Sequence, residues 1–177
     1  MNRGFFEHIR FSLCSEVDKM LEQKSYIFRV IFFLVINFGA LALGGLLQGK
    51  GAFTGWYADL NKAPWTPPGW VFGAAWFTIM FCFSFYMASL TGKGSKLVLV
   101  LFAIQFLLNV SWNPIFFKFH QVLLGLIVIT TLTVLMAFFG IKYWSDLKLK
   151  SLLVLPYVIW LCIATSLNAY ILFKNPV

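Results

Sequence analysis

The chain has 177 residues, of which 60% are hydrophobic and 11% are charged, and its mean hydropathy is +0.84. Soluble domains carry about 25% charged residues, so this composition excludes a soluble enzyme and indicates an integral membrane protein. The net charge of +8 does not indicate a nucleic-acid partner, because the 14 basic residues are scattered between apolar runs and form no continuous basic face.

The first 25 residues are too charged to span a bilayer and form a separate N-terminal extension, followed by a membrane domain at 26–177. They lack a signal-peptide pattern, so we expect them to be retained. Their apolar residues recur at helical spacing, which predicts an amphipathic helix on the membrane surface, with a frayed extension as the alternative. These residues are Phe5, Ile9, Leu13, Val17, Met20 and Leu21.

Five long apolar segments follow, at residues 27–47, 69–90, 97–117, 122–141 and 152–173. Each is near the roughly 20 residues that a helix needs to cross the hydrocarbon. Backbone polar groups in lipid must be satisfied within their own segment, so these segments are helices. The predicted fold class is therefore all-α, an integral membrane bundle of five transmembrane helices. The connections are short and imply antiparallel neighbours, except for a long first loop at about 48–68.

The loops are unequally charged. Ten of the 14 Lys and Arg residues fall on the N-terminal side of the predicted spans, and four fall on the opposite side. This bias predicts a cytoplasmic N-terminus in a bacterial inner membrane, with a mitochondrial or outer membrane as alternatives. The first loop would then lie on the far side.

Three features of the sequence carry little functional signal. The spacing Ala40-x-x-x-Gly44 in the first span allows close helix approach, which favours packing within the chain over a homodimer face. The three cysteines and two histidines show no metal-ligand spacing, so we expect no metal site. All six acidic residues lie outside the spans, and no serine has a histidine in plausible reach, which argues against hydrolysis and phosphoryl transfer.

Polar and aromatic residues share faces of three spans. In lipid such residues either hydrogen-bond between helices or line a cavity. Trp76 and Trp160 lie about two turns inside their spans, deeper than an interfacial tryptophan, and a planar aromatic ligand between them would use both. The third span carries Gln105, Asn109, Trp112 and Phe116, the fifth carries Tyr157, Trp160, Ala164 and Asn168, and the second carries Trp76 and Met80.

Three motifs make the chain resemble the translocator protein family, also called tryptophan-rich sensory proteins or peripheral-type benzodiazepine receptors. They are WYADLNKAPWTPPGWVFGAAW from residue 56, QFLLNVSWNPIFF from residue 105 and PYVIWLCIATSLNAY from residue 156. The resemblance covers about residues 30 to 173. It implies a five-helix bundle whose pocket is covered by the first loop as a lid, and the loop's prolines would limit the entropy lost when it closes.

The resemblance also implies ligands. Family members bind porphyrins such as protoporphyrin IX and haem, synthetic isoquinolines and benzodiazepines, and in some cases cholesterol, and no cofactor is required. The tryptophans matching Trp76 and Trp160 are implicated in light-dependent porphyrin breakdown. The predicted ligand-binding residues are Tyr57, Trp65, Trp76, Asn109, Trp112, Ile115, Phe116, Trp160, Ala164 and Asn168.

The sequence departs from the family pattern at two places. The usual Lys-Pro of the first motif is Lys62-Ala63, and the tyrosine of the sterol-recognition pattern, Tyr170, is displaced by one position, with Ala169 in its place. The second departure argues against cholesterol as the ligand. Three functions remain open: a porphyrin-binding receptor or sensor, a light-dependent porphyrin-degrading enzyme, and a transporter of porphyrin or sterol.

Overall fold

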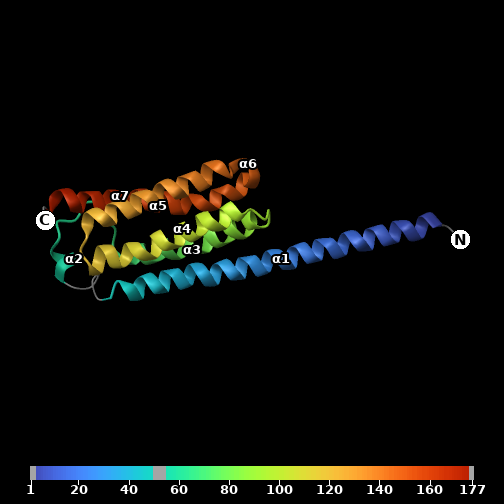
Figure 1. Ribbon diagram of the computed structural model, residues 1–177, viewed down its shortest axis with the longest axis horizontal. Helices are drawn as coiled ribbons and strands as arrows, with labels where there is room; N and C mark the ends of the chain where they lie inside the picture. The colour runs from blue at the N-terminus through green and yellow to red at the C-terminus, as the bar shows by residue number, and fades with distance from the viewer. Residues whose placement is uncertain (1–2, 50–54, 176–177) are drawn as a thin grey trace.

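The computed structural model describes residues 3–49 and 55–175, without the side chains of residues 3–15 and 17. The described residues form helices joined by loops and contain no strand, and five helical segments are long and apolar enough to cross a membrane. The all-α five-span prediction is therefore confirmed. Figure 1 shows these helices side by side in one bundle, with α1 projecting far beyond it toward the N-terminus.

The first helix, α1 (Arg3–Leu47), is 45 residues long. At 1.5 Å per residue it extends about 68 Å, roughly twice the thickness of a hydrocarbon core. It passes the predicted domain boundary at residue 26 without a break, and the exposed residues 18–24 contact no other element. The side chains of Phe5, Ile9, Leu13 and Val17 lie outside the described residues. The position of residues 1–25 on a membrane surface stays a prediction.

Prolines mark several helix boundaries. α3 (Gly69–Thr91) follows Pro67 and Pro68, and α4 (Lys96–Asn113) ends at Pro114. Proline has no amide hydrogen to donate and its ring clashes with the preceding turn, so the chain continues beyond α4 as a π-helical turn, η2 (Pro114–Lys118). In that turn Phe119 N donates to Pro114 O at 2.9 Å.

The second half of the chain folds back along the first. α5 (Val122–Lys142) leads through the short α6 (Trp144–Leu147) and the 3-10 turn η3 (Lys148–Val154) into α7 (Leu155–Lys174). The fifth span was expected from residue 152, but its regular helix begins at Leu155. Pro156 fits the first turn of a helix, because the amide hydrogens there have no partner within the helix.

The core lies nearer the end of the bundle where α1 enters. α1 packs on α3 and α4, α5 packs on α7 and α4, and α3 packs on α7. Buried polar groups connect these helices: Asn37 Nδ2 donates to Ser84 Oγ at 2.9 Å, and the Tyr86 hydroxyl donates to Phe139 O at 2.8 Å. The largest fully buried side chains include Phe83, Tyr86, Met87, Phe139, Met136 and Tyr157.

Small residues of α1 pack within the chain. Ala40 is buried, and a methyl group added at Gly44 would lie 2.7 Å from Asn113 Nδ2 on α4. Glycine at this position lets α1 approach α4 closely. The Ala40-x-x-x-Gly44 spacing is thus used for intramolecular contact.

Candidate functional site

A cavity of about 680 Å³ opens at the end of the bundle opposite the N-terminus. Its walls come from α1, α3, α4, η2, α5 and α7, and the first loop covers one side. The size lies within the range of about 300–1,000 Å³ that is usual for small-molecule sites. The lining consists of Ala40, Leu41, Gly45, Gln48, Tyr57, Lys62, Thr66, Pro67, Gly69, Phe72, Gly73, Trp76, Asn109, Trp112, Asn113, Phe116, Phe117, Ile129, Trp160, Ala164, Leu167, Asn168 and Ile171.

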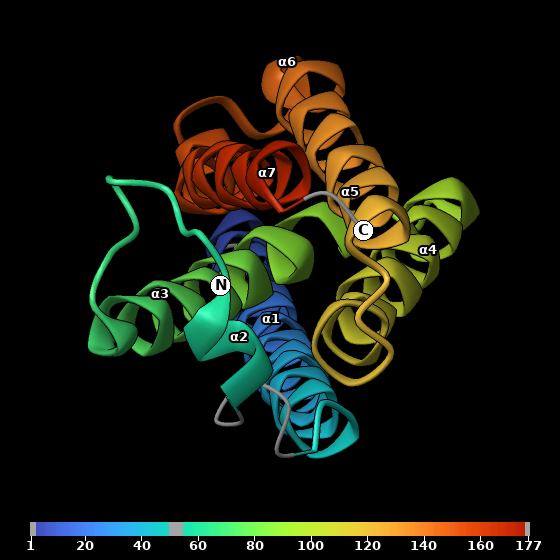
Figure 2. The same cartoon turned by 90° about the vertical axis from the view of Figure 1, so that its left-hand side faces the viewer.

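The first loop lies across this end of the bundle, and it contains the short helix α2 (Gly55–Asp59) (Figure 2). Tyr57 of α2 reaches the cavity wall, where its ring meets Phe116 and Phe117 edge to face, with centroids 6.3 and 5.4 Å away. Lys62 Nζ lies 5.0 Å from the centre of the Tyr57 ring. Burial raises the pKa of Tyr57 above its usual value by disfavouring the charged phenolate.

The far part of the loop is attached to α7. Asn61 N donates to Asn175 Oδ1 at 2.8 Å, and Asn175 Nδ2 donates back to Asn61 O at 3.2 Å. Trp65 Nε1 donates to Ser166 Oγ at 3.2 Å, and the Trp65 ring meets Tyr170 edge to face at 5.3 Å. We call these contacts the loop latch. The loop latch holds the loop over the cavity by attaching the edge of the loop to α7. The latch does not fill the cavity.

Aromatic rings build the cavity walls in pairs. Trp112 stacks on Phe116 with centroids 5.2 Å apart and planes 12° from parallel. Trp160 meets Phe72 edge to face at 5.2 Å, and Trp76 meets Tyr157 in the same way at 6.1 Å. Each tryptophan is therefore oriented by a second ring, which leaves a largely preformed aromatic surface for a ligand.

Three buried polar atoms of the cavity walls have no hydrogen-bond partner among the described residues. They are Trp112 Nε1, Trp160 Nε1 and Asn168 Oδ1. The Asn168 amide nitrogen is satisfied, since Nδ2 donates to Val122 O at 3.2 Å. A buried polar atom without a partner costs about 1–3 kcal/mol, so each of these three atoms of cavity-lining residues would be stabilised by a hydrogen-bond partner.

The polar stripe predicted on the third span divides between two roles. Gln105 Nε2 donates to the Tyr157 hydroxyl at 2.8 Å, so Gln105 connects α4 to α7 within the core. Asn109, one turn further along α4, lines the cavity. Its side chain makes no hydrogen bond to another described residue, whereas the Gln105 side chain does.

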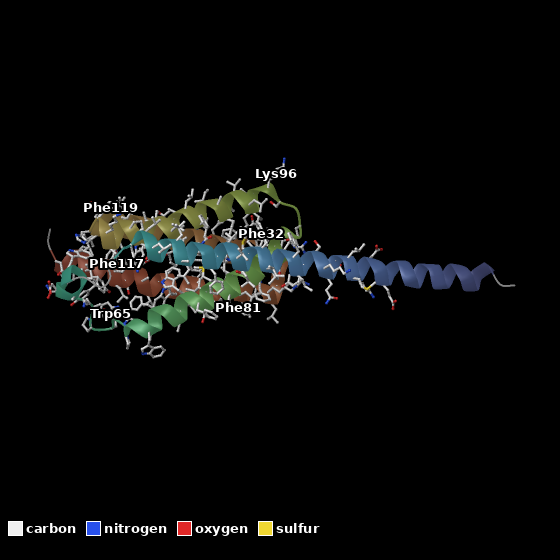
Figure 3. All side chains as sticks on the ribbon, turned by 90° about the horizontal axis from the view of Figure 1, so that it is seen from below. Phe32, Trp65, Phe81, Lys96, Phe117 and Phe119 are labelled. Atoms are coloured by element: carbon white, nitrogen blue, oxygen red, sulfur yellow. The ribbon has the colours of Figure 1, made fainter. Side chains whose placement is uncertain are left out.

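Eight of the ten predicted ligand-binding residues line the cavity: Tyr57, Trp76, Asn109, Trp112, Phe116, Trp160, Ala164 and Asn168. Trp65 and Ile115 are not part of the lining. Trp65 has 54% of its surface exposed and belongs to the latch, and it lies near the loop end of the bundle in Figure 3. The roles of these residues in ligand binding stay predictions.

Sequence reasoning missed several lining residues that helical spacing could have revealed. Phe72 and Gly73 precede Trp76 by four and three residues, and Asn113 follows Asn109 by four. Residues at these spacings share one face of a helix. Lys62 gave no such signal, because its position depends on the path of the loop.

A second concavity, an open groove of about 590 Å³, runs along α5. All of its lining residues come from that helix, and the only polar ones are Thr130 and Thr131. The Thr131 hydroxyl already donates to Ile127 O at 2.8 Å. The groove therefore offers apolar surface to lipid and none of the converging polar groups found in the loop-end cavity.

Comparison with known proteins agrees with this architecture. Residues 31–174 match the TspO/MBR family. Protein CrtK of Rhodobacter capsulatus is 34% identical over 126 residues, covering 68% of this chain and 79% of the relative. A tryptophan-rich sensory protein of Cereibacter sphaeroides is 35% identical, covering 64% and 72%, and the human translocator protein is 32% identical, covering 77% and 83%. The family match spans all five membrane helices and the first loop, and the chain belongs to the TspO/MBR family of integral, multi-pass membrane proteins.

Proposed function

We propose that the protein is a membrane receptor or sensor that binds a porphyrin, such as protoporphyrin IX or haem, or a related flat lipophilic molecule. Binding would serve the regulation of tetrapyrrole metabolism or of a stress response. One observation carries the proposal: an aromatic cavity whose wall holds two buried indole N–H groups without partners. The sensory role is further supported by the name of the Cereibacter sphaeroides relative.

A porphyrin combines the two properties that this cavity favours. Its flat ring matches the paired aromatic walls, and its carboxylate groups accept hydrogen bonds from Trp112 and Trp160. Lys62 lines the cavity at the loop, where its ammonium group suits a carboxylate. A purely apolar ligand would leave both indole N–H groups without partners.

A second function, light-dependent degradation of the bound porphyrin, is favoured by one specific observation. Trp76 and Trp160, the two tryptophans with a predicted photochemical role, both line the same cavity. An indole in contact with an excited porphyrin can take part in electron transfer, whereas a phenyl ring of similar size is a much poorer donor.

The test is a titration of the purified protein with protoporphyrin IX in the dark, followed by porphyrin absorbance. Saturable binding is expected, and Trp112→Phe should weaken it about threefold to tenfold, because one hydrogen bond of about 0.5–1.5 kcal/mol is lost. Trp144→Phe is the matched control, since Trp144 is exposed and outside the cavity. No saturable binding, or equal losses in the two variants, would contradict the proposal.

Illumination of the same samples separates the two functions. If the protein degrades its ligand, the absorbance of the bound porphyrin falls in light, and Trp76→Phe stops the loss while a large ring preserves most of the affinity. A spectrum that stays unchanged in light would leave the receptor function alone.

A further inference from the structure

We propose that Arg29 of α1 and Lys150 of η3 form a binding site for the phosphate of an anionic phospholipid, at the end of the bundle opposite the cavity. The two cations come from segments far apart in the sequence and meet at one aromatic ring. Arg29 Cζ lies 6.0 Å and Lys150 Nζ lies 5.5 Å from the centre of the Tyr26 ring. The site is independent of the porphyrin cavity.

Arg29 is held in place by the end of α3. Its Nε donates to Ala88 O at 3.0 Å, and its Nη1 donates to Ser25 Oγ at 2.7 Å. A methyl group added at Gly92 would lie 3.1 Å from Nη2, so glycine there leaves room for the guanidinium. The negative end of the α3 dipole favours this cation. The guanidinium is therefore fixed before any lipid arrives.

Neither cation is neutralised within the described part of the chain. Asp146, the acidic residue of the neighbouring loop, pairs instead with Lys93 at 2.8 Å. Glu22 lies one turn outward from Tyr26 on α1 and forms no ion pair with Arg29 or Lys150. The positive charge at Tyr26 remains available for an anion from outside the chain.

The surroundings fit a lipid better than a soluble phosphate. Arg29 lies at the end of α3, against Ala88 and Gly92, and each of the two cations directly follows a strongly exposed apolar residue in the sequence. Phe28 beside Arg29 is 70% exposed, and Leu149 beside Lys150 is 79% exposed. A phospholipid can place its phosphate between the cations and its acyl chains along these apolar surfaces, whereas a soluble phosphate gains nothing from them.

The experiment adds lipid to the protein purified in a neutral detergent and counts bound lipid by native mass spectrometry. Phosphatidylglycerol is compared with phosphatidylcholine of the same acyl chains and with glycerol 1-phosphate, its soluble head group. We expect a saturable 1:1 complex with phosphatidylglycerol only. If glycerol 1-phosphate binds as tightly as phosphatidylglycerol, the ligand is not a lipid. If phosphatidylcholine binds as tightly as phosphatidylglycerol, the two cations do not select an anionic head group.

Lys150→Gln is the decisive variant, because the Lys150 side chain makes no hydrogen bond to another described residue. Its affinity for phosphatidylglycerol should fall about fivefold, the contribution of one basic residue near a membrane. Lys96→Gln removes the same charge from the same end, where Lys96 points away from the bundle (Figure 3), and should bind as the unaltered protein does. Equal losses of phosphatidylglycerol affinity in both variants would mean that the overall positive charge of this end attracts the lipid, which would contradict a specific site at Arg29 and Lys150. Circular dichroism verifies that both variants fold.

Discussion

At the scale of single residues, two amides of α4 show how position decides a role. Gln105 and Asn109 are four residues apart and share a helical face, yet they lie about 6 Å apart along the axis. At Gln105 the facing element is α7, packed closely enough for the bond to Tyr157. At Asn109 the facing space is the cavity. The same side-chain chemistry therefore stabilises the bundle at one position and is available to a ligand at the other.

This difference predicts opposite effects for two similar substitutions. Gln105→Leu should lower the stability of the protein by about 1 kcal/mol, because the buried Tyr157 hydroxyl loses its partner, and should leave porphyrin affinity unchanged. Asn109→Leu should weaken porphyrin binding severalfold with little loss of stability. Thermal unfolding in detergent and a dark porphyrin titration measure the two effects. A destabilised Asn109→Leu variant with intact affinity would show that Asn109 connects helices instead.

At the scale of elements, the first loop is the segment whose position depends most on contacts with another element. It contains one short helix, α2, and it is fixed by stacking at one side and by the latch at the other. Trp56 stacks on His120 with centroids 4.1 Å apart, and Asn61 and Asn175 exchange hydrogen bonds across 114 positions of sequence. Few groups thus hold the loop over the cavity.

We therefore predict that Asn175→Ala loosens the loop. Losing the three bonds between Asn61 and the Asn175 side chain should speed porphyrin release at least about tenfold, at a net contribution near 0.5–1.5 kcal/mol per bond. Limited proteolysis with trypsin at Lys62 supplies a readout without any ligand and should also become faster. Asn61→Ala keeps the backbone N and O of residue 61, so it should have a smaller effect than Asn175→Ala, and the double variant should exceed Asn175→Ala by little. Unchanged cleavage at Lys62 would contradict the latch.

At the scale of the whole molecule, the bundle has a solid half and a hollow half. Near the entry of α1, large side chains such as Phe83, Tyr86 and Phe139 fill the space between helices. At the other end, small residues such as Ala40, Gly73 and Ala164 line the cavity. Stability therefore resides mainly in one half, which leaves the other free to enclose a ligand.

The part of α1 outside the bundle contributes to neither half. Its described residues 18–24 are all exposed, so a variant lacking residues 2–24 keeps Tyr26 and Arg29 and removes no buried residue among those whose side chains the structure describes. We expect its unfolding temperature to change by no more than about 2 °C and its porphyrin affinity to stay within about twofold. Differential scanning fluorimetry and the dark titration measure both values. A tenfold loss of affinity would assign the extension a role in the site.

The sequence by itself determined the membrane class, the five spans, the family and eight of the residues that line the cavity. Hydropathy indicates which segments bury their backbone groups in lipid, and proline ends a helix because it has no amide hydrogen to donate. Both effects are local, so they can be recognised from the sequence alone. Helical spacing likewise showed that Asn109, Trp112 and Phe116 share a face.

Only the tertiary structure decided which residues or cavity lie opposite each helical face. It assigned Gln105 to the core and Asn109 to the cavity, moved Trp65 from the predicted ligand site to the latch, and brought Lys150 to Tyr26. It also showed that the indole N–H groups of Trp112 and Trp160 have no hydrogen-bond partner in the described part of the chain. The physical reason is that helical periodicity fixes the direction of a side chain relative to its neighbours on the same helix, whereas its partner depends on how segments distant in sequence pack together.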